Sequence, residues 1–129
     1  MTEPKRVLII DDDLFVSDLY SLELQRSGFM VTTANGGELG LSKIPLEKPD
    51  IILLDVAMPV MDGLTVLSKI RENSQFNSIK VMLLTNIRDE ETIRDGLSKG
   101  ADGYLLKTSL TPQQVVEEVI KAFHISKIG

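Results

Sequence analysis

Short apolar runs alternate with longer amphipathic segments along the whole chain. The runs fall at Lys5–Ile10, Met30–Ala34, Asp50–Leu54, Lys80–Leu84 and Gly103–Leu106, and we expect each to form a strand. Continuous runs rich in Ile, Val and Leu suit strands that are buried on both faces of a parallel sheet. The second run is interrupted by threonines, which indicates a strand at the edge of the sheet.

The segments between these runs carry apolar residues at helical spacing and predict five helices. They are a helix capped by Asp13 and ended by Gly28, a glycine-weakened helix at Asn35–Ile44, and helices at Leu64–Arg71, at Asp89–Lys99 and from Thr111 onward. In the first helix, Phe15, Leu19 and Leu22 should face the core, and Leu14, Val16 and Tyr20 should widen this apolar face. In the fourth, Ile93 and Leu97 should do so. Strands that alternate with helices predict an α/β fold, a doubly wound five-stranded parallel sheet.

The composition narrows the chemistry that the chain can perform. It has 129 residues, a net charge of −5, no Cys and a single His. The lack of Cys excludes disulfides, thiolate zinc sites and thiol catalysis, and the acidic balance argues against a nucleic-acid surface. The apolar runs are too short to span a membrane and no signal-peptide pattern is present. We therefore expect a cytoplasmic protein with one domain over residues 1–129.

Polar residues stand at the ends of four predicted strands. They are Asp11 and Asp12 after the first strand, Asp55 after the third, Thr85 after the fourth and Lys107 after the fifth. The carboxyl ends of parallel strands meet at one edge of the sheet, so these side chains should converge in one crevice. Crowded carboxylates without His or Cys favour a Mg²⁺ ion, while a Lys and a Thr suit phosphate oxygens. A carboxylate beside a metal can attack a phosphoryl group and form an aspartyl phosphate.

Four motifs resemble those of the receiver domain of bacterial two-component response regulators. They are VLIIDDD near the start, DIILLDVAMPVMDG in the middle, VMLLT before the fourth helix and KGADGYLLK near the end. The resemblance covers essentially the whole chain. It implies a flavodoxin-like (βα)5 fold with strand order 2-1-3-4-5. It also implies a phosphorylation-dependent signalling switch rather than an enzyme with small-molecule turnover.

The resemblance assigns a role to each residue of the predicted crevice. Asp55 would accept a phosphoryl group from a histidine kinase or a histidine phosphotransfer protein, and Lys107 would pair with the phosphate. A Mg²⁺ ion would be held by Asp55, by Asp12 directly, by Asp11 mainly through water, and by the backbone carbonyl of Ala57.

By the same resemblance, Thr85 and Tyr104 form the switch. Thr85 would move toward the phosphate and Tyr104 would follow inward, which would remodel the face made by the fourth helix, the fifth strand and the fifth helix. The downstream partner is then an unidentified protein or output domain. Phosphorylation-dependent dimerisation through that face stays open.

The chain departs from the family pattern at four positions. Thr108 follows Lys107 where the family usually has Pro, so we expect a trans peptide bond and a shifted loop. Asn86 stands where the family has a small residue, and it either narrows access to the phosphate or hydrogen-bonds near it. Ala57 and Ile87 occupy positions that modulate hydrolysis, and neither side chain can orient a water. We therefore hypothesise a long-lived phosphorylated form.

Two other functions stay open at the level of sequence. Asp11 and Asp13 make the D-x-D pattern of haloacid-dehalogenase-like phosphatases, in which Asp11 would be the nucleophile. The Thr or Val that commonly follows the D-x-D pattern is missing, and the chain is short for that family. The departures at Thr108 and Asn86 also allow an interaction module that keeps the fold without being phosphorylated.

Overall fold

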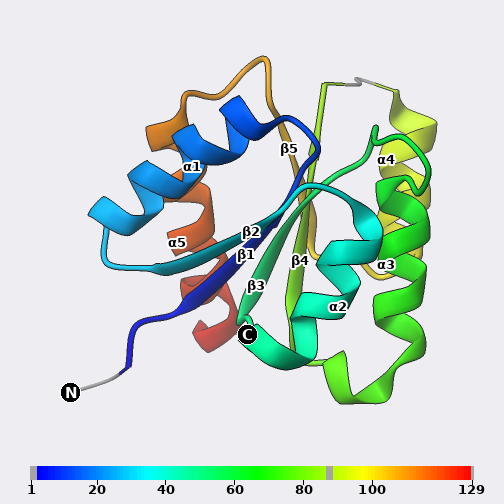
Figure 1. The fold of residues 1–129 in the computed structure, drawn as a ribbon, viewed down its shortest axis with the longest axis horizontal. Coiled ribbons are helices and arrows are strands. Elements are labelled where there is room, and N and C mark those ends of the chain that lie inside the picture. Colours follow the sequence, from blue (N-terminus) through cyan, green and yellow to red (C-terminus); the bar gives the residue numbers. More distant parts are fainter. Residues whose placement is uncertain (1–2, 87–88, 129) are drawn as a thin grey trace.

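Strands and helices alternate in the computed structural model, which describes residues 3–86 and 89–128, the residues from 124 onward by their backbone alone (Figure 1). The strands are β1 (Arg6–Ile10), β2 (Met30–Ala34), β3 (Ile51–Asp55), β4 (Lys80–Thr85) and β5 (Gly103–Leu106). The helices are α1 (Leu14–Arg26), α2 (Gly37–Glu47), α3 (Gly63–Glu72), α4 (Glu90–Ser98) and α5 (Pro112–Ile128), with a short 3-10 helix, η1 (Ser74–Phe76), after α3. The predicted alternation of elements is confirmed.

The five strands form one parallel sheet in the order β2-β1-β3-β4-β5, and β2 lies at an edge as its threonines predict. Helices α1 and α5 cover one face, and α2, α3 and α4 cover the other (Figure 1). Each face has its own core: Tyr20, Leu24 and Val119 belong to the first, and Ile44 and Leu67 to the second. None of the described helices combines the length and the apolar character that crossing a bilayer requires.

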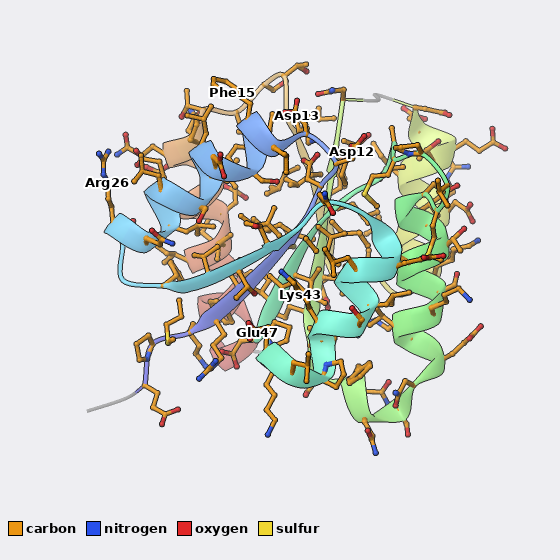
Figure 2. The ribbon with its side chains drawn as sticks, in the orientation of Figure 1. Asp12, Asp13, Phe15, Arg26, Lys43 and Glu47 are labelled. Atoms are coloured by element: carbon orange, nitrogen blue, oxygen red, sulfur yellow. The ribbon has the colours of Figure 1, made fainter. Side chains whose placement is uncertain are left out.

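Helix α1 buries only part of the apolar face that its sequence predicts, because Tyr20 is buried whereas most of the other predicted positions are exposed. Phe15, Leu19 and Leu22 were expected inward, yet they are 73%, 39% and 46% exposed. Phe15 points away from the sheet in Figure 2. The buried positions are Tyr20 and Leu24, together with Ser17. The reason is that α1 has apolar residues on more than one face, so periodicity alone does not choose between them.

Helix α4 is anchored even more lightly than its sequence predicts. Gly96 is its one fully buried residue among the described positions, Ile93 is half-buried, and Leu97 is 43% exposed and so does not face the core as expected. The buried glycine lets the helix approach β4 closely, because a Cβ at this position would overlap the side chain of Leu83.

Helix α2 extends past the predicted end at Ile44. It includes Pro45 and ends at Glu47, where Lys48 takes a left-handed conformation with φ 50° and its N–H donates to the Ile44 carbonyl. A proline in the last turn removes only one helical hydrogen bond, and the buried side chain of Ile44 holds this turn against the sheet.

The register of the sheet places the carboxyl ends of the inner strands next to one another. Ile10 pairs with Leu54, Asp55 with Leu84, and the last pair of β4 and β5 is Thr85 with Leu106. Residues that are far apart in the sequence therefore meet at this edge, which is where ligands bind in open α/β sheets.

Candidate functional site

Three aspartates gather at the carboxyl edge of the sheet. Asp11 follows β1 and is fully buried, Asp55 ends β3 and is 5% exposed, and Asp12 is exposed. One carboxylate oxygen from each lies within 4.8 Å of the other two. Asp12 lies between the end of β1 and the start of α1 (Figure 2). The predicted convergence of these residues is confirmed.

The start of α1 holds Asp11 in place. Its Oδ1 accepts a hydrogen bond from the Asp13 N–H at 2.9 Å, and its own N–H donates to the Ala34 carbonyl at 3.0 Å. Asp13 caps the helix, because its Oδ1 accepts from the N–H groups of Phe15 and Val16. Asp13 thus has a structural role, as the predicted helix cap.

Lys107 reaches the aspartates from the end of β5. Its Nζ lies 2.6 Å from Asp11 Oδ2 and 3.4 Å from Asp55 Oδ1, and its side chain is 11% exposed. The Lys107–Thr108 peptide bond is trans, as the missing proline predicts. Thr85 is 2% exposed at the end of β4, and its carbonyl accepts a hydrogen bond from the Lys107 N–H at 2.9 Å.

The charges of the site shift the pKa values of its members. Burial, reinforced by the Asp11 carboxylate, raises the pKa of Asp55 to about 7, although Lys107 acts in the opposite direction. Burial also opposes the charged form of Lys107, but its contacts with Asp11 and Asp55 prevail and raise the pKa of the ammonium. One ammonium therefore serves two buried carboxylates, and the site is short of positive charge.

The aspartate cluster fits a hard divalent cation. Its donors are carboxylate oxygens, which Mg²⁺ prefers, and burial together with the Asp11 carboxylate raises the pKa of Asp55 despite Lys107. Ala57, whose carbonyl the resemblance assigns to the metal, lies two residues after Asp55 in an exposed loop.

Thr85 and Tyr104, which the resemblance assigns to the switch, do not belong to the aspartate cluster. Tyr104 is on β5, opposite Leu83 of β4, and is 41% exposed. Asn86 is exposed directly after β4. Ile87, at a position that modulates hydrolysis in the family that the chain resembles, lies outside the described residues.

The loop after Asp55 contains a strained turn. Val60 has a φ of 70° and is 99% exposed, and the N–H of Met61 donates to the carbonyl of Pro59 at 2.7 Å around it. A hydrogen bond from residue i+2 to residue i with a positive φ between them is a γ-turn, which is costly for a β-branched residue. The turn brings the chain back toward β3 in few residues.

Gly63 closes the same loop against the end of β3. Its N–H donates to the carbonyl of Val56 at 2.8 Å. A Cβ on Gly63 would overlap the carbonyl oxygen of Asp55 and lie 2.8 Å from the Cα of Val56. Only a glycine lets α3 begin this close to the strand end that carries Asp55.

A family model of the response regulator receiver domain matches residues 7–120. The chain belongs to this family. It is 37% identical over 126 residues to the alkaline phosphatase synthesis transcriptional regulatory protein PhoP of Bacillus subtilis, an alignment that covers 97% of this chain and 51% of that protein. It is 31% identical over 128 residues to the transcriptional regulatory protein KdpE of Staphylococcus aureus, covering 95% and 54%. The receiver chain thus spans about half the length of these curated relatives.

Solved structures of receivers agree with the fold. Chemotaxis protein CheY4 of Vibrio cholerae superposes with a TM-score of 0.86 at 30% identity, covering 92% of this chain and 98% of that one. A matched chain from the CheX–CheY–BeF3–Mg complex of Borrelia burgdorferi gives a TM-score of 0.84 at 32% identity, covering 93% and 90%. The flavodoxin-like receiver fold predicted from the motifs is therefore confirmed.

The receiver site also includes a residue that sequence reasoning assigned only to packing. Tyr20 of α1 is 5% exposed, and burial raises the pKa of its hydroxyl. Lys107, Asp11 and Asp55 all act electrostatically on this group. No motif indicates it, because its position depends on which face α1 turns toward the sheet.

Replacing Gly63 with Ala should destabilise the protein. The added methyl overlaps the main chain of β3, so we expect Gly63→Ala to lower the free energy of unfolding by about 2 kcal/mol or more. Urea unfolding monitored by circular dichroism measures the change. Gly36→Ser is the control, because a Cβ there meets nothing within 4 Å and Ser is a good N-cap. Equal losses in both variants would contradict the close-approach explanation.

The stability of the metal-free protein should depend on pH through Asp55. Its pKa is raised from 3.8 to about 7 by folding, so the folded state keeps a proton that the unfolded chain has released between these values. The free energy of unfolding therefore falls as pH rises through this range. At about pH 8 with a chelator, Asp55→Asn should be more stable than the wild type by about 1–3 kcal/mol.

This advantage of Asp55→Asn should shrink as the pH falls and be lost at about pH 3 or below, where Asp55 is mostly neutral in both states. Urea midpoints across a pH series measure it. The exposed Asp12→Asn variant is the control and should show a smaller difference. Parallel pH profiles for the wild type and Asp55→Asn would rule out the raised pKa.

Proposed function

We propose that this chain is a phosphorylation-dependent signalling switch in which Asp55 accepts the phosphoryl group. The observation that carries the proposal is the position of Asp55, buried at the end of β3, with Lys107 Nζ 3.4 Å from its Oδ1 and two more aspartates around it. The donor is a histidine kinase or a histidine phosphotransfer protein, as the family membership supports.

In this reaction a phosphoryl group moves from a histidine nitrogen of the donor to a carboxylate oxygen of Asp55. A carboxylate oxygen of Asp55 attacks the phosphorus of the donor's phosphohistidine, an O–P bond forms as the P–N bond breaks, and the released imidazole takes up a proton. Lys107 offers an ammonium to the phosphoryl oxygens as they arrive beside Asp55. Because the pKa of Asp55 is about 7, added positive charge favours the reactive carboxylate at neutral pH.

Asp11, Asp12 and Asp55 would hold Mg²⁺ in this reaction, with the carbonyl of Ala57 as a further ligand. The bound ion would neutralise the carboxylates and the phosphoryl oxygens. The chain itself supplies the acceptor oxygen and the ammonium, and it has no small-molecule turnover in this function.

The signal would leave the site through Thr85 and Tyr104. Thr85 is buried where β4 ends, and the half-exposed Tyr104 lies on the neighbouring strand. Helix α4 begins just beyond β4 with Gly96 as its one buried residue among the described positions, so its repacking costs little apolar contact. The face of α4, β5 and α5 is therefore the output surface toward a downstream protein or output domain.

Phosphorylation of Asp55 can be mapped directly. The full chain is incubated with acetyl phosphate and Mg²⁺, and the modified residue is located by reductive labelling and mass spectrometry. We expect modification at Asp55 in the wild type and none in Asp55→Asn. In Lys107→Ala the rate of modification should fall by about tenfold or more, because the ammonium beside the acceptor is lost. The exposed Asp18→Asn variant on α1 should react as the wild type does.

The same experiment separates the other functions. Modification at Asp11 would favour a phosphatase, although Asp11 is fully buried and its Oδ2 is paired with Lys107. No modification under any condition would favour an interaction module that does not use phosphorylation.

The lifetime of the phosphorylated form should depend on Ala57. This residue is exposed in the loop after β3, and its methyl group cannot orient an attacking water. We expect Ala57→Asn to release phosphate roughly threefold faster than the wild type or more, because an amide can hydrogen-bond a water beside the phosphoryl group. Phosphate release from purified phosphoprotein measures the rate, with Ala57→Val as the apolar control. Slower release from Ala57→Asn would contradict the hypothesis.

A further inference from the structure

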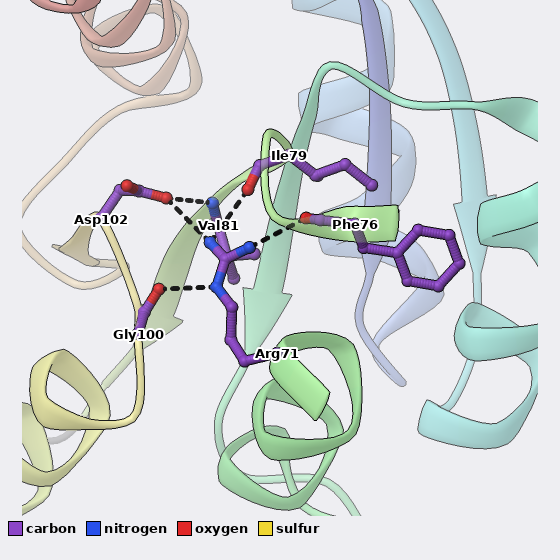
Figure 3. Close-up of polar contacts among 6 residues, drawn as sticks. All are labelled: Arg71, Phe76, Ile79, Val81, Gly100 and Asp102. Carbon is purple, nitrogen blue, oxygen red and sulfur yellow. Dashed lines mark hydrogen bonds and ion pairs between the residues drawn. The ribbon is translucent and has the colours of Figure 1, made fainter. Parts of the chain in front are cut away.

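Arg71 joins four segments of the chain (Figure 3). They meet at the amino edge of the sheet, whereas the aspartates lie at its carboxyl edge. Its Nε donates to the carbonyl of Gly100 at 2.9 Å, its Nη1 to that of Phe76 at 3.1 Å, and its Nη2 to that of Ile79 at 2.9 Å. Nη2 also lies 3.2 Å from Asp102 Oδ2. The end of α3, η1, the entry to β4 and the α4–β5 turn are thus tied to one guanidinium, whose side chain is 18% exposed.

Asp102 carries this connection into the pairing of β4 with β5. Its Oδ2 accepts a hydrogen bond from the Val81 N–H at 2.8 Å, and its own N–H donates to the Val81 carbonyl at 2.8 Å (Figure 3). Met82 and Gly103 form the first pair of the two strands directly afterwards. Asp102 therefore brackets one residue of β4 at the point where the ladder with β5 begins.

The apolar pattern of β5 does not set this register by itself. Leu105 is the strand's buried residue, but Tyr104 and Leu106 on either side of it are also apolar. A shift by one residue would put another apolar side chain into the place of Leu105. Register is weakly specified in such a short edge strand unless another interaction fixes it.

The register of β5 decides how far Lys107 reaches. A strand advances by about 3.3 Å per residue, so a shift by one residue moves Lys107 by about that distance. Its Nζ lies 2.6 Å from Asp11 and 3.4 Å from Asp55, and a displacement of this size would break both contacts. The N–H of Lys107 donates to the carbonyl of Thr85 at 2.9 Å, at the end of the pairing between β4 and β5. A shift of β5 by one residue would break this bond as well.

We propose that Arg71 and Asp102 are positioning residues that fix the register of β5 and thereby place Lys107 beside the phosphoryl acceptor. The effect of Arg71 and Asp102 on phosphorylation rests on the proposed function. Their effect on the register of β5 does not depend on it. An arginine suits it, because its planar fork meets several carbonyl and carboxylate oxygens at once in a fixed geometry, which a lysine ammonium does not.

A double-mutant cycle separates positioning from general structural support. Initial rates of Asp55 phosphorylation by acetyl phosphate are measured for the full chain, Arg71→Gln, Lys107→Ala and the double variant, at a temperature where all are folded. We expect Arg71→Gln to lower the rate by about tenfold when Lys107 is present, and by about twofold or less when it is absent. Equal losses in both backgrounds would overturn the proposal.

Two matched variants accompany the cycle. Lys69→Gln removes an exposed positive charge from the same helix and should leave the rate unchanged. Arg71→Lys keeps the charge but not the fork, and it replaces Arg71→Gln in the cycle if that variant does not fold. A loss from Lys69→Gln as large as that from the Arg71 variant would assign the effect to charge and overturn the proposal.

Amide hydrogen exchange tests the strand independently of phosphorylation. In Arg71→Gln the N–H groups of Asp102 and Lys107 should exchange about tenfold faster than in Lys69→Gln, while those of Leu8 in β1 should not. Unchanged exchange at Lys107 would overturn the proposal. If the wild type takes up no phosphoryl group at Asp55, the proposed function fails, and this exchange still decides whether Arg71 sets the register.

Discussion

The site depends on one ammonium that serves two buried carboxylates. Lys107 lies between Asp11 and Asp55, and its charge does not offset their burial and mutual repulsion. This shortage of positive charge explains why the cluster fits a divalent cation. A phosphoryl group bound there would add further negative charge to the site. Such a site needs a rigid surrounding, since the attraction that holds it together falls quickly if Lys107 moves away.

Helix α3 supplies much of that rigidity from both of its ends. At its start, Gly63 allows the helix to begin against the main chain of Asp55. At its end, Arg71 ties the entry of β4 to the turn before β5. Between them Val66 and Ile70 are buried against the sheet. The same helix therefore contacts the strand of Asp55 directly, and it contacts the strand of Lys107 through the hydrogen bonds of Arg71 to carbonyl and carboxylate oxygens.

Helix α4 contrasts with this frame. Gly96 is its one buried residue among the described positions, while its first turn is made of exposed acidic residues. Its far end is connected to Arg71 through the carbonyl of Gly100, whereas in the chain its beginning follows β4, which ends in the buried Thr85. A helix that is held at one end and lightly packed along its length is suited to respond to a change at the aspartate cluster.

The sequence alone determined the order of the strands and helices along the chain and the convergence of Asp11, Asp12, Asp55 and Lys107. Short, continuous apolar runs that alternate with helices favour strands of a parallel sheet, and polar residues at the ends of such strands converge on one edge. The tertiary structure decided which face of α1 is buried, because Phe15 and Leu19 compete with Tyr20 and Leu24 until the sheet and α5 are in place. It also decided the raised pKa of Asp55 and the partners of Arg71. These depend on burial and on carbonyls from distant segments, which a linear pattern of side chains does not encode.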